Sequence, residues 1–289
     1  MFVHGDNIAQ KIRDTRKYND ETANTYLEEI SGLYEQWKAD NLALRGPYIS
    51  KTENDTGIIS ERVRLFNTYK DFVDQQRYAE KFDSRSNLHS SVLEEFLFYL
   101  FKDLAESYSS EVLIGKSSAF KDIFFSPRNY TEMISNPCAR IERKDHDFVI
   151  GVSIETMMRC VGSENTDSVV IQVPAIAIEC KTYLDKTMLE ASSTAGAQLK
   201  MRNPNALYLI ATEWLKLSDD VNLWKYKIDQ IYVLRKQRNT DREFRFLPSY
   251  IKNPIYPDVV EHLFFRVRDH LSSDWEGGIT HGLERGFLI

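Results

Sequence analysis

Several features that would assign a protein to a class at a glance are missing from this sequence of 289 residues. It contains no run of about 18 apolar residues, so we expect no membrane span. Its first 20 residues contain no apolar segment of the kind found in secretory signals. It also lacks a glycine-rich phosphate loop, which argues against a small-molecule enzyme built on a Rossmann-type sheet.

Cysteine is too scarce to organise the fold. The three cysteines, Cys138, Cys160 and Cys180, are an odd number, and their spacing is not that of a metal site. We therefore expect buried, reduced thiols in a cytoplasmic protein, and neither a disulfide framework nor a zinc site.

Basic residues are outnumbered by acidic ones. The chain has 37 lysines and arginines against 43 aspartates and glutamates, which gives a formal net charge of −6. This balance argues mildly against a nucleic-acid partner. It does not exclude one, because phosphate binding depends on where the basic residues lie, and an acidic exterior can surround a basic cleft.

Apolar residues, in contrast, are plentiful enough for a full core, at 42% hydrophobic and 12% aromatic content. The length suits one large domain, or one domain with an extension. Apolar residues recur at helical spacing in residues 21–45 and 58–76, and Gly46-Pro47 ends the first of these segments. We expect an N-terminal helical region over residues 1–80 and a second domain over residues 81–289.

The remainder of the chain predicts a mixed arrangement of helices and strands. Pro174 interrupts the clearest strand, which predicts an edge position or a bulge there. From the order helix, strands, helix, strand we expect an α/β fold with a central mixed sheet flanked by helices. The expected helices span 92–104, 185–202 and 257–270, and the expected strands span 111–114, 122–125, 147–158, 169–181, 206–211 and 230–234.

Chemically reactive side chains gather at the end of one strand, in the stretch AIAIECKTYLDK, residues 175–186. Because side chains alternate along a strand, Glu179 and Lys181 share one face, while Ile178 and Cys180 lie on the other. Both charged residues are therefore expected to project together at the carboxyl end of the strand, where α/β sheets place their sites.

A further carboxylate, Asp147, opens the strand that precedes this one. The polar loop at 162–168 lets the two strands pair antiparallel, which could place Asp147 beside Glu179. Two close carboxylates repel each other unless a cation lies between them, and Mg²⁺ prefers oxygen ligands. A neighbouring lysine can orient an attacking water or stabilise charge on a phosphoryl group. The alternative is a solvated strand end, with Glu179 and Lys181 as a surface ion pair.

An aspartate, a hairpin and then Glu-x-Lys resemble the signature of the PD-(D/E)XK nuclease superfamily. Longer blocks resemble type II restriction endonucleases of the BbvCI kind, which cut asymmetric or interrupted seven-base-pair sites related to CCTNAGC. The blocks follow one another across roughly residues 65–240: FDSR (82–85), SVLEEFLFYLF (91–101), KDHDFVIG (144–151), VPAIAIECKTYL (173–184), LYLIATEWLKL (207–217) and IDQIYVLRKQRN (228–239).

The resemblance implies a restriction-endonuclease-like core with an N-terminal helical extension, and it makes residues 81–289 the catalytic and DNA-recognition domain. By the same resemblance, Asp147 and Glu179 are the metal-binding carboxylates and Lys181 is the catalytic lysine. The backbone carbonyl of Cys180 would be a further metal ligand.

Two positions depart from the motif or leave a choice. The superfamily often adds a helical glutamate that tunes the metal site, and Glu95 matches best, with Glu94 as its neighbour; a helical wheel does not separate them. His146 stands where the motif has proline, so Asp145 competes with Asp147. We favour Asp147 because it begins the apolar strand, and we expect His146 to be structural or solvent-facing.

The activity implied by the resemblance is Mg²⁺-dependent, sequence-specific hydrolysis of double-stranded DNA, with 5′-phosphate and 3′-hydroxyl products, in a prokaryotic cell. One active site cuts one strand, so we expect a homodimer or a heterodimer with a related subunit. Alone, one subunit of a heterodimer would act as a strand nicker or a DNA-binding module. A repair nuclease of the same fold is a further alternative.

Arginine to guanine is the commonest specific contact in the major groove, which draws attention to the basic run RKQRNTDR. Residues just before Asp147 are expected to hold phosphates. Lys200 is a weaker candidate, Tyr183 and Trp214 are expected to pack, and the alternative for each basic residue is a solvated loop. The DNA-binding candidates are Arg235, Lys236, Gln237, Arg238, Asn239 and Arg242 in the basic run, Arg140, Arg143 and Lys144 before the aspartate, and Arg85.

Overall fold

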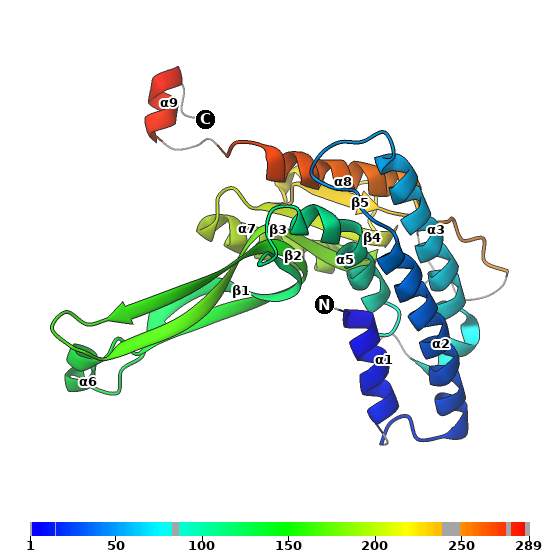
Figure 1. Ribbon diagram of the computed structural model, residues 1–289, viewed down its shortest axis with the longest axis horizontal. Helices are drawn as coiled ribbons and strands as arrows, with labels where there is room; N and C mark the ends of the chain where they lie inside the picture. Colours follow the sequence, from blue (N-terminus) through cyan, green and yellow to red (C-terminus); the bar gives the residue numbers. More distant parts are fainter. Residues whose placement is uncertain (1, 15, 83–86, 239–248, 276–278, 287–289) are drawn as a thin grey trace.

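The computed structural model describes residues 2–14, 16–82, 87–238, 249–275 and 279–286. Figure 1 shows a body of helices and sheet from which a long β arm projects. The helices are α1 (Val3–Arg13), α2 (Glu21–Ala43), α3 (Asp55–Val73), α4 (Gln76–Lys81), α5 (Ser91–Glu106), α6 (Tyr130–Ser135), α7 (Lys186–Arg202), α8 (Pro257–Ser272) and α9 (Ile279–Arg285). The strands are β1 (Leu113–Phe125), β2 (Ala139–Arg159), β3 (Thr166–Leu184), β4 (Leu207–Leu215) and β5 (Gln230–Val233).

The sheet has two halves of different character. Its five strands lie in the order β1-β2-β3-β4-β5. Strands β1, β2 and β3 pair antiparallel, whereas β3, β4 and β5 pair parallel, with α7 as the crossover between β3 and β4. Strand β4 in the parallel half is buried along almost its whole length, as its near-continuous apolar sequence requires. The expected α/β fold with a mixed sheet flanked by helices is confirmed.

Strand β2 serves both the body and the arm, because it turns back on itself at Gly151. Its register against β3 shifts between Ile150 and Gly151, which faces Pro174. A side chain at Gly151 would place its Cβ 2.3 Å from the carbonyl oxygen of Val173, so only glycine allows this close approach. Residues 139–146 of β2 pair with β1 and residues 152–159 pair with β3, so two ribbons run outward together (Figure 1). The irregularity expected at Pro174 is therefore present.

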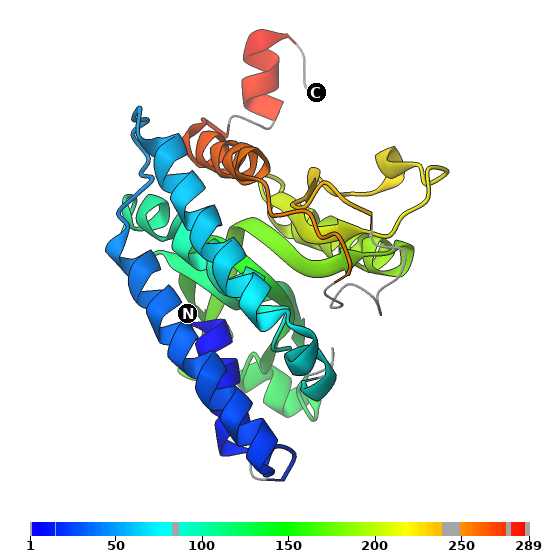
Figure 2. The ribbon, with the colours of Figure 1, turned by 90° about the vertical axis from the view of Figure 1, so that its right-hand side faces the viewer.

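The N-terminal helices cover one side of the body, as Figure 2 shows for α2 and α3. They pack around α5, in which all but two of the 16 residues are buried. A helix that is apolar on nearly every side belongs at the centre of a fold. One hydrophobic cluster runs from α2 and α3 through α5 to the sheet and α8. Among the described residues, no helix has the length and apolarity needed to cross a membrane.

Candidate active site

The site lies where β2 and β3 separate. Their last backbone pair at this end is Phe148 with Ile178. Beyond this pair, the amide of Cys180 on β3 donates to Asp147 Oδ2 at 2.9 Å. The aspartate side chain therefore takes the place of a backbone carbonyl of β2 as the acceptor. The fork thus fixes the position of Asp147 relative to the end of β3.

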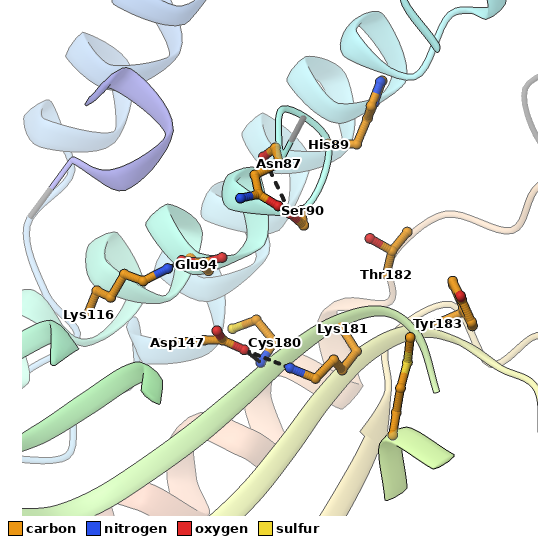
Figure 3. A pocket seen from close by; sticks show the side chains of 11 residues that line it. Asn87, His89, Ser90, Glu94, Lys116, Asp147, Cys180, Lys181, Thr182 and Tyr183 are labelled. Atoms are coloured by element: carbon orange, nitrogen blue, oxygen red, sulfur yellow. Dashed lines mark hydrogen bonds and ion pairs between the residues drawn. The ribbon is translucent and has the colours of Figure 1, made fainter. Parts of the chain in front are cut away.

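The structure brings Asp147, Glu179 and Lys181 together. Lys181 Nζ donates to Asp147 Oδ2 at 2.9 Å and to Glu179 Oε2 at 3.0 Å (Figure 3 shows the first of these contacts). The two carboxylates therefore share one ammonium group. This is not the solvated surface pair of the alternative interpretation, since Glu179 is only 8% exposed.

The other carboxylate oxygen of Glu179 has two partners of its own. Tyr208 donates its hydroxyl to Glu179 Oε1 at 3.0 Å, and His146 Nδ1 lies 3.2 Å from the same oxygen. Burial alone would raise the pKa of Glu179, but the His146 hydrogen bond and the Lys181 charge outweigh it and lower the pKa to about 2. Burial also opposes the charge on Lys181, yet Asp147 and Glu179 raise its pKa above the usual value. Both Glu179 and Lys181 are therefore charged at neutral pH.

His146 is buried, at 3% exposure, and belongs to the site. The expectation of a structural or solvent-facing histidine is correct only in that the residue is structural. The sequence signal was its place beside Asp147, but nothing local showed that β2 would turn it toward Glu179 and Tyr208. Asp145, the competing aspartate, is exposed on the arm and accepts a hydrogen bond from Ser118 at 2.7 Å.

A cavity of about 340 Å³ opens in front of Asp147 and Lys181 (Figure 3). Its walls come from the start of α5, from β1 and from the end of β3. The lining residues are Asn87, His89, Ser90, Glu94, Lys116, Asp147, Cys180, Lys181, Thr182, Tyr183 and Met188. A second hollow, of about 470 Å³, shares Asn87, Glu94 and Lys116 with the first and is closed on its far side by α1. The two hollows therefore adjoin at these three residues.

The helical glutamate at the cavity is Glu94, not Glu95. Glu94 contacts Lys116 Nζ at 3.2 Å, and burial together with the nearby charge of Asp147 raises its pKa. Glu95 points the other way and accepts hydrogen bonds from the amides of His4 and Gly5 and from the Tyr99 hydroxyl. The structure therefore does not bring Glu95 to the site, because that carboxylate anchors the start of α1.

The donors around the cavity suit a hard divalent cation. Asp147 and Glu94 supply carboxylate oxygens to the cavity wall. Glu179 does not line the cavity itself, but it accepts a hydrogen bond from Lys181, which does. Within the described part of the chain, no three acidic, histidine or cysteine side chains are already gathered as a metal site. The Lys181 ammonium holds the position between the two carboxylates, so an ion shared by them requires Lys181 to turn toward the cavity.

The three cysteines are free thiols, and of the three only Cys180 is buried, while Cys138 and Cys160 are partly buried. Burial raises the pKa of the Cys180 thiol, so it stays protonated. The amide of Cys180 donates to Asp147.

Arg235, expected to read DNA, is instead completely buried. Its guanidinium pairs with Glu213 at 2.9 Å, donates to the Asn253 carbonyl and stacks on Trp214. That prediction is wrong, since a side chain with no exposed surface cannot reach a base. Trp214, at 1% exposure, is a packing residue as expected.

The residues after Arg235 have partners on the protein surface. Lys236 pairs with Asp258 and Arg238 with Asp219, and both basic side chains are about half exposed. Gln237 uses both ends of its amide on the main chain of Ile251 and Asn253. Lys200 pairs with Asp229. Three of the DNA-binding candidates, Arg85, Asn239 and Arg242, lie outside the described residues.

The three phosphate-binding candidates of β2 lie on the arm. Lys144, Arg143 and Arg140 are exposed and follow one another away from Asp147. At about 3.3 Å per residue, Lys144 lies roughly 10 Å from Asp147 and Arg140 roughly 23 Å. Arg143 also donates to the Val170 carbonyl at 3.2 Å, which ties the two ribbons together. Phosphate contact is therefore easiest for Lys144.

Comparisons with known proteins give the family and the fold of the chain. The sequence model of a family described as Bpu10I restriction endonuclease matches residues 85–288. The structure is similar to a solved structure described as the native BbvCI A2B2 tetramer at low resolution, with a TM-score of 0.65 and 19% sequence identity over 93% of this chain and 97% of that one. No curated protein matches the chain significantly.

The matching family model makes the chain a restriction endonuclease of the type II class, and the structure adds a carboxylate and lysine cluster at the fork of an α/β sheet. The chain belongs to the Bpu10I restriction endonuclease family, whose model covers well over half of it. It is a site-specific deoxyribonuclease, and DNA is its substrate, as the sequence predicted.

Proposed function

We propose that this chain hydrolyses one phosphodiester bond of duplex DNA with the help of Mg²⁺, at a short site related to CCTNAGC, and leaves a 5′-phosphate. The observation that carries the proposal is the pair of contacts from Lys181 to Asp147 and Glu179 at the edge of a cavity. The recognition site and the products rest on the family resemblance.

Asp147, Glu179 and the Cys180 carbonyl are the proposed holders of the ion, and Glu94 takes the role that sequence reasoning gave to Glu95. A bound Mg²⁺ would supply positive charge against the scissile phosphate and make a bound water more acidic. Lys181, freed from one of its two carboxylates, would orient the attacking water and stabilise the charge that develops on the phosphate. Asn87 and Lys116 line both hollows and would contact the DNA backbone next to the cut.

We also propose that the working enzyme contains a second subunit. One cavity of this kind can cut one strand, so a break in both strands needs two. The solved relative is described as a tetramer of two kinds of subunit. A related partner subunit is accordingly our preferred source of the second site, and an identical subunit is the alternative.

Plasmid digestion tests these proposals together. Supercoiled plasmid is incubated with the purified chain and Mg²⁺, and the product ends are sequenced. Nicks at one recurrent sequence with 5′-phosphates support the proposal with a related partner, and linear product supports identical subunits. Uncut plasmid at every divalent metal concentration, or cuts without sequence preference, would contradict the proposed specific cleavage.

A further inference from the structure

The second hollow beside the active site is walled on one side by α1. The four side chains of α1 that line it recur at intervals of three and four along the chain, and we call them the α1 row: Val3, Asp6, Asn7 and Gln10. This spacing places them along a single face of the helix. The hollow adjoins the catalytic cavity at Glu94 and Lys116, so the α1 row lies next to the place where DNA is cut.

The opposite side of α1 is anchored in the protein. Glu95 accepts hydrogen bonds from the amides of His4 at 2.8 Å and Gly5 at 3.1 Å. The ring of His4 contacts Ser91 Oγ at 2.9 Å and the Tyr69 hydroxyl at 2.7 Å. The helix therefore presents the α1 row in a fixed position, and a surface that is already ordered loses little conformational entropy when a ligand binds.

The polar members of the α1 row are not used to hold the fold together. Asp6 and Gln10 are exposed, and the Gln10 amide has no hydrogen-bond partner within the described part of the chain. Asn7 accepts a hydrogen bond from Lys11 Nζ at 2.8 Å, which fixes the direction of its amide. The row therefore offers a carboxylate and two amides to whatever enters the hollow.

The charge of the hollow favours the edges of bases over phosphates. Two carboxylates, Asp6 and Glu94, line it, and Lys116, a cation of the same wall, is already paired with Glu94 at 3.2 Å. Phosphate binding draws on positive charge, which is not in excess here. Base edges carry no formal charge, and their exocyclic amino groups donate to carboxylate and amide oxygens.

We infer that the α1 row reads base pairs next to the cut and that Gln10 recognises an adenine there. A glutamine amide can bond N6 and N7 of adenine at the same time, a pattern that the other bases do not offer. Asp6 and Asn7 are the matching contacts for the adjoining base edges. This inference rests on the proposed function, because that function brings a specific duplex to the cavity.

The length of the α1 row limits which base pairs it reaches. From Val3 to Gln10 the helix rises roughly 10 Å, which is about three base pairs of DNA. The pairs that it reads therefore lie within about three of the scissile bond. The helix precedes residues 85–288, the part of the chain that the family model matches, so this role is not inherited from the family.

Selection of bound DNA tests the α1 row without requiring cleavage. Duplex DNA with a randomised central segment is mixed with Mg²⁺ and the chain carrying Lys181→Ala, which should leave bound DNA uncut, and the gel-shifted fraction is sequenced. This parent chain should enrich one motif that contains an A·T pair. Adding Gln10→Ala should weaken the preference at one A·T pair by about 10- to 100-fold and leave the other positions unchanged. Gln10→Glu keeps an acceptor but loses the amino donor, so it should shift that position from adenine toward cytosine.

The matched control is Ile12→Ala, at a position of α1 that is 48% exposed and lies roughly 200° around the helix from Gln10. It should enrich the same motif as the parent chain. All three variants should melt close to the parent, because both side chains are exposed.

Three results would overturn the inference. The motif could survive both Gln10 variants unchanged, which would remove α1 from recognition. Gln10→Ala could weaken binding equally for every sequence, which would make Gln10 a contact to the DNA backbone. The parent chain could enrich no motif at all, in which case the proposed specific cleavage fails and the role of the α1 row fails with it. The first two results leave the proposed function standing.

Discussion

Two clusters of acidic and basic side chains lie on neighbouring strands of this protein, one beside a cavity and the other buried in the core. Asp147, Glu179 and Lys181 gather at the end of β3 beside a cavity. On β4, Glu213 is 1% exposed and sits between Lys70 at 3.1 Å and Arg235 at 2.9 Å.

In the buried cluster each carboxylate has its own cations, whereas the other cluster is open. Lys70 also pairs with Asp74 at 2.7 Å, and Asp74 in turn contacts His89 at 3.1 Å and Lys252 at 3.7 Å. In the open cluster one ammonium serves two carboxylates, which leaves a net negative charge at the cavity. Removing one partner of a matched buried cluster destabilises a fold, because it leaves an uncompensated buried charge. Unmatched negative charge beside a cavity can instead bind a cation.

The largest effect is expected in the open cluster. Lys181→Ala or Asp147→Ala should lower the rate of DNA cleavage at saturating Mg²⁺ by at least about 10²- to 10³-fold, because charge stabilisation at the phosphate is lost. Binding of duplex DNA, measured by gel shift, should persist. Undiminished cleavage by both variants would remove these residues from the chemistry.

The buried cluster should instead govern stability. Arg235→Met leaves Glu213 with one cation in place of two and should lower the free energy of unfolding by about 3–5 kcal/mol, as measured by urea denaturation. The cleavage rate per folded molecule and the choice of site should stay unchanged. A stable Arg235→Met protein that cuts at altered sequences would return Arg235 to the DNA interface.

A smaller effect is expected where a buried residue supports the open cluster. His146→Ala removes one of the two groups that hold Glu179 Oε1 and leaves only Tyr208 there. Cleavage should slow by about 10- to 100-fold, the usual effect of losing a group that orients a ligand. The Mg²⁺ concentration for half-maximal rate should rise at the same time. If only the melting temperature changed, His146 would be a packing residue and nothing more.

The neighbours Glu94 and Glu95 give the most closely matched pair of variants. Glu94→Gln should raise the Mg²⁺ requirement and leave stability almost unchanged. Glu95→Gln should lower the free energy of unfolding by about 1–3 kcal/mol, because the amides of His4 and Gly5 lose a charged acceptor. The opposite pattern, in which Glu95→Gln alone changes the metal requirement, would favour the original sequence assignment.

Acid should loosen the attachment of α1 over a defined pH range. Burial lowers the pKa of His4 from 6.5 to about 3, so the folded state holds this imidazole neutral. The unfolded chain binds the extra proton first, and stability is lost as the pH falls from about 6.5 toward 3. His4→Gln should flatten that part of the stability-versus-pH curve; an unchanged slope would show that His4 does not contribute to it.

The alternation of side chains along a single strand was sufficient to predict which residues of the site share a face. Alternation along residues 175–181 placed Glu179 and Lys181 on one face, and the apolar strand that follows Asp147 distinguished it from Asp145. The position of Glu94 could not be obtained in this way, because α5 is buried on nearly every side and periodicity gives no polar face to choose.

Contacts between distant segments explain the remaining differences. Arg235 belonged to a basic run, and nothing near it in the sequence showed that Glu213, 22 positions earlier, would bury it. The two short strands expected at 111–114 and 122–125 are parts of one strand, β1. Their union depends on pairing with the long strand β2, which turns at Gly151. The helix α1 escaped notice because its attachment depends on Glu95, 91 positions away from His4.

The most direct test of the central claim measures cleavage of supercoiled plasmid as Mg²⁺ is titrated, for the wild-type chain and for Lys181→Ala side by side. The account predicts that cleavage by the wild type rises from zero with Mg²⁺ and is abolished by a chelator, while Lys181→Ala stays at least about 10²-fold slower at every concentration. Cleavage that is independent of the metal, or equal in the two proteins, would contradict it.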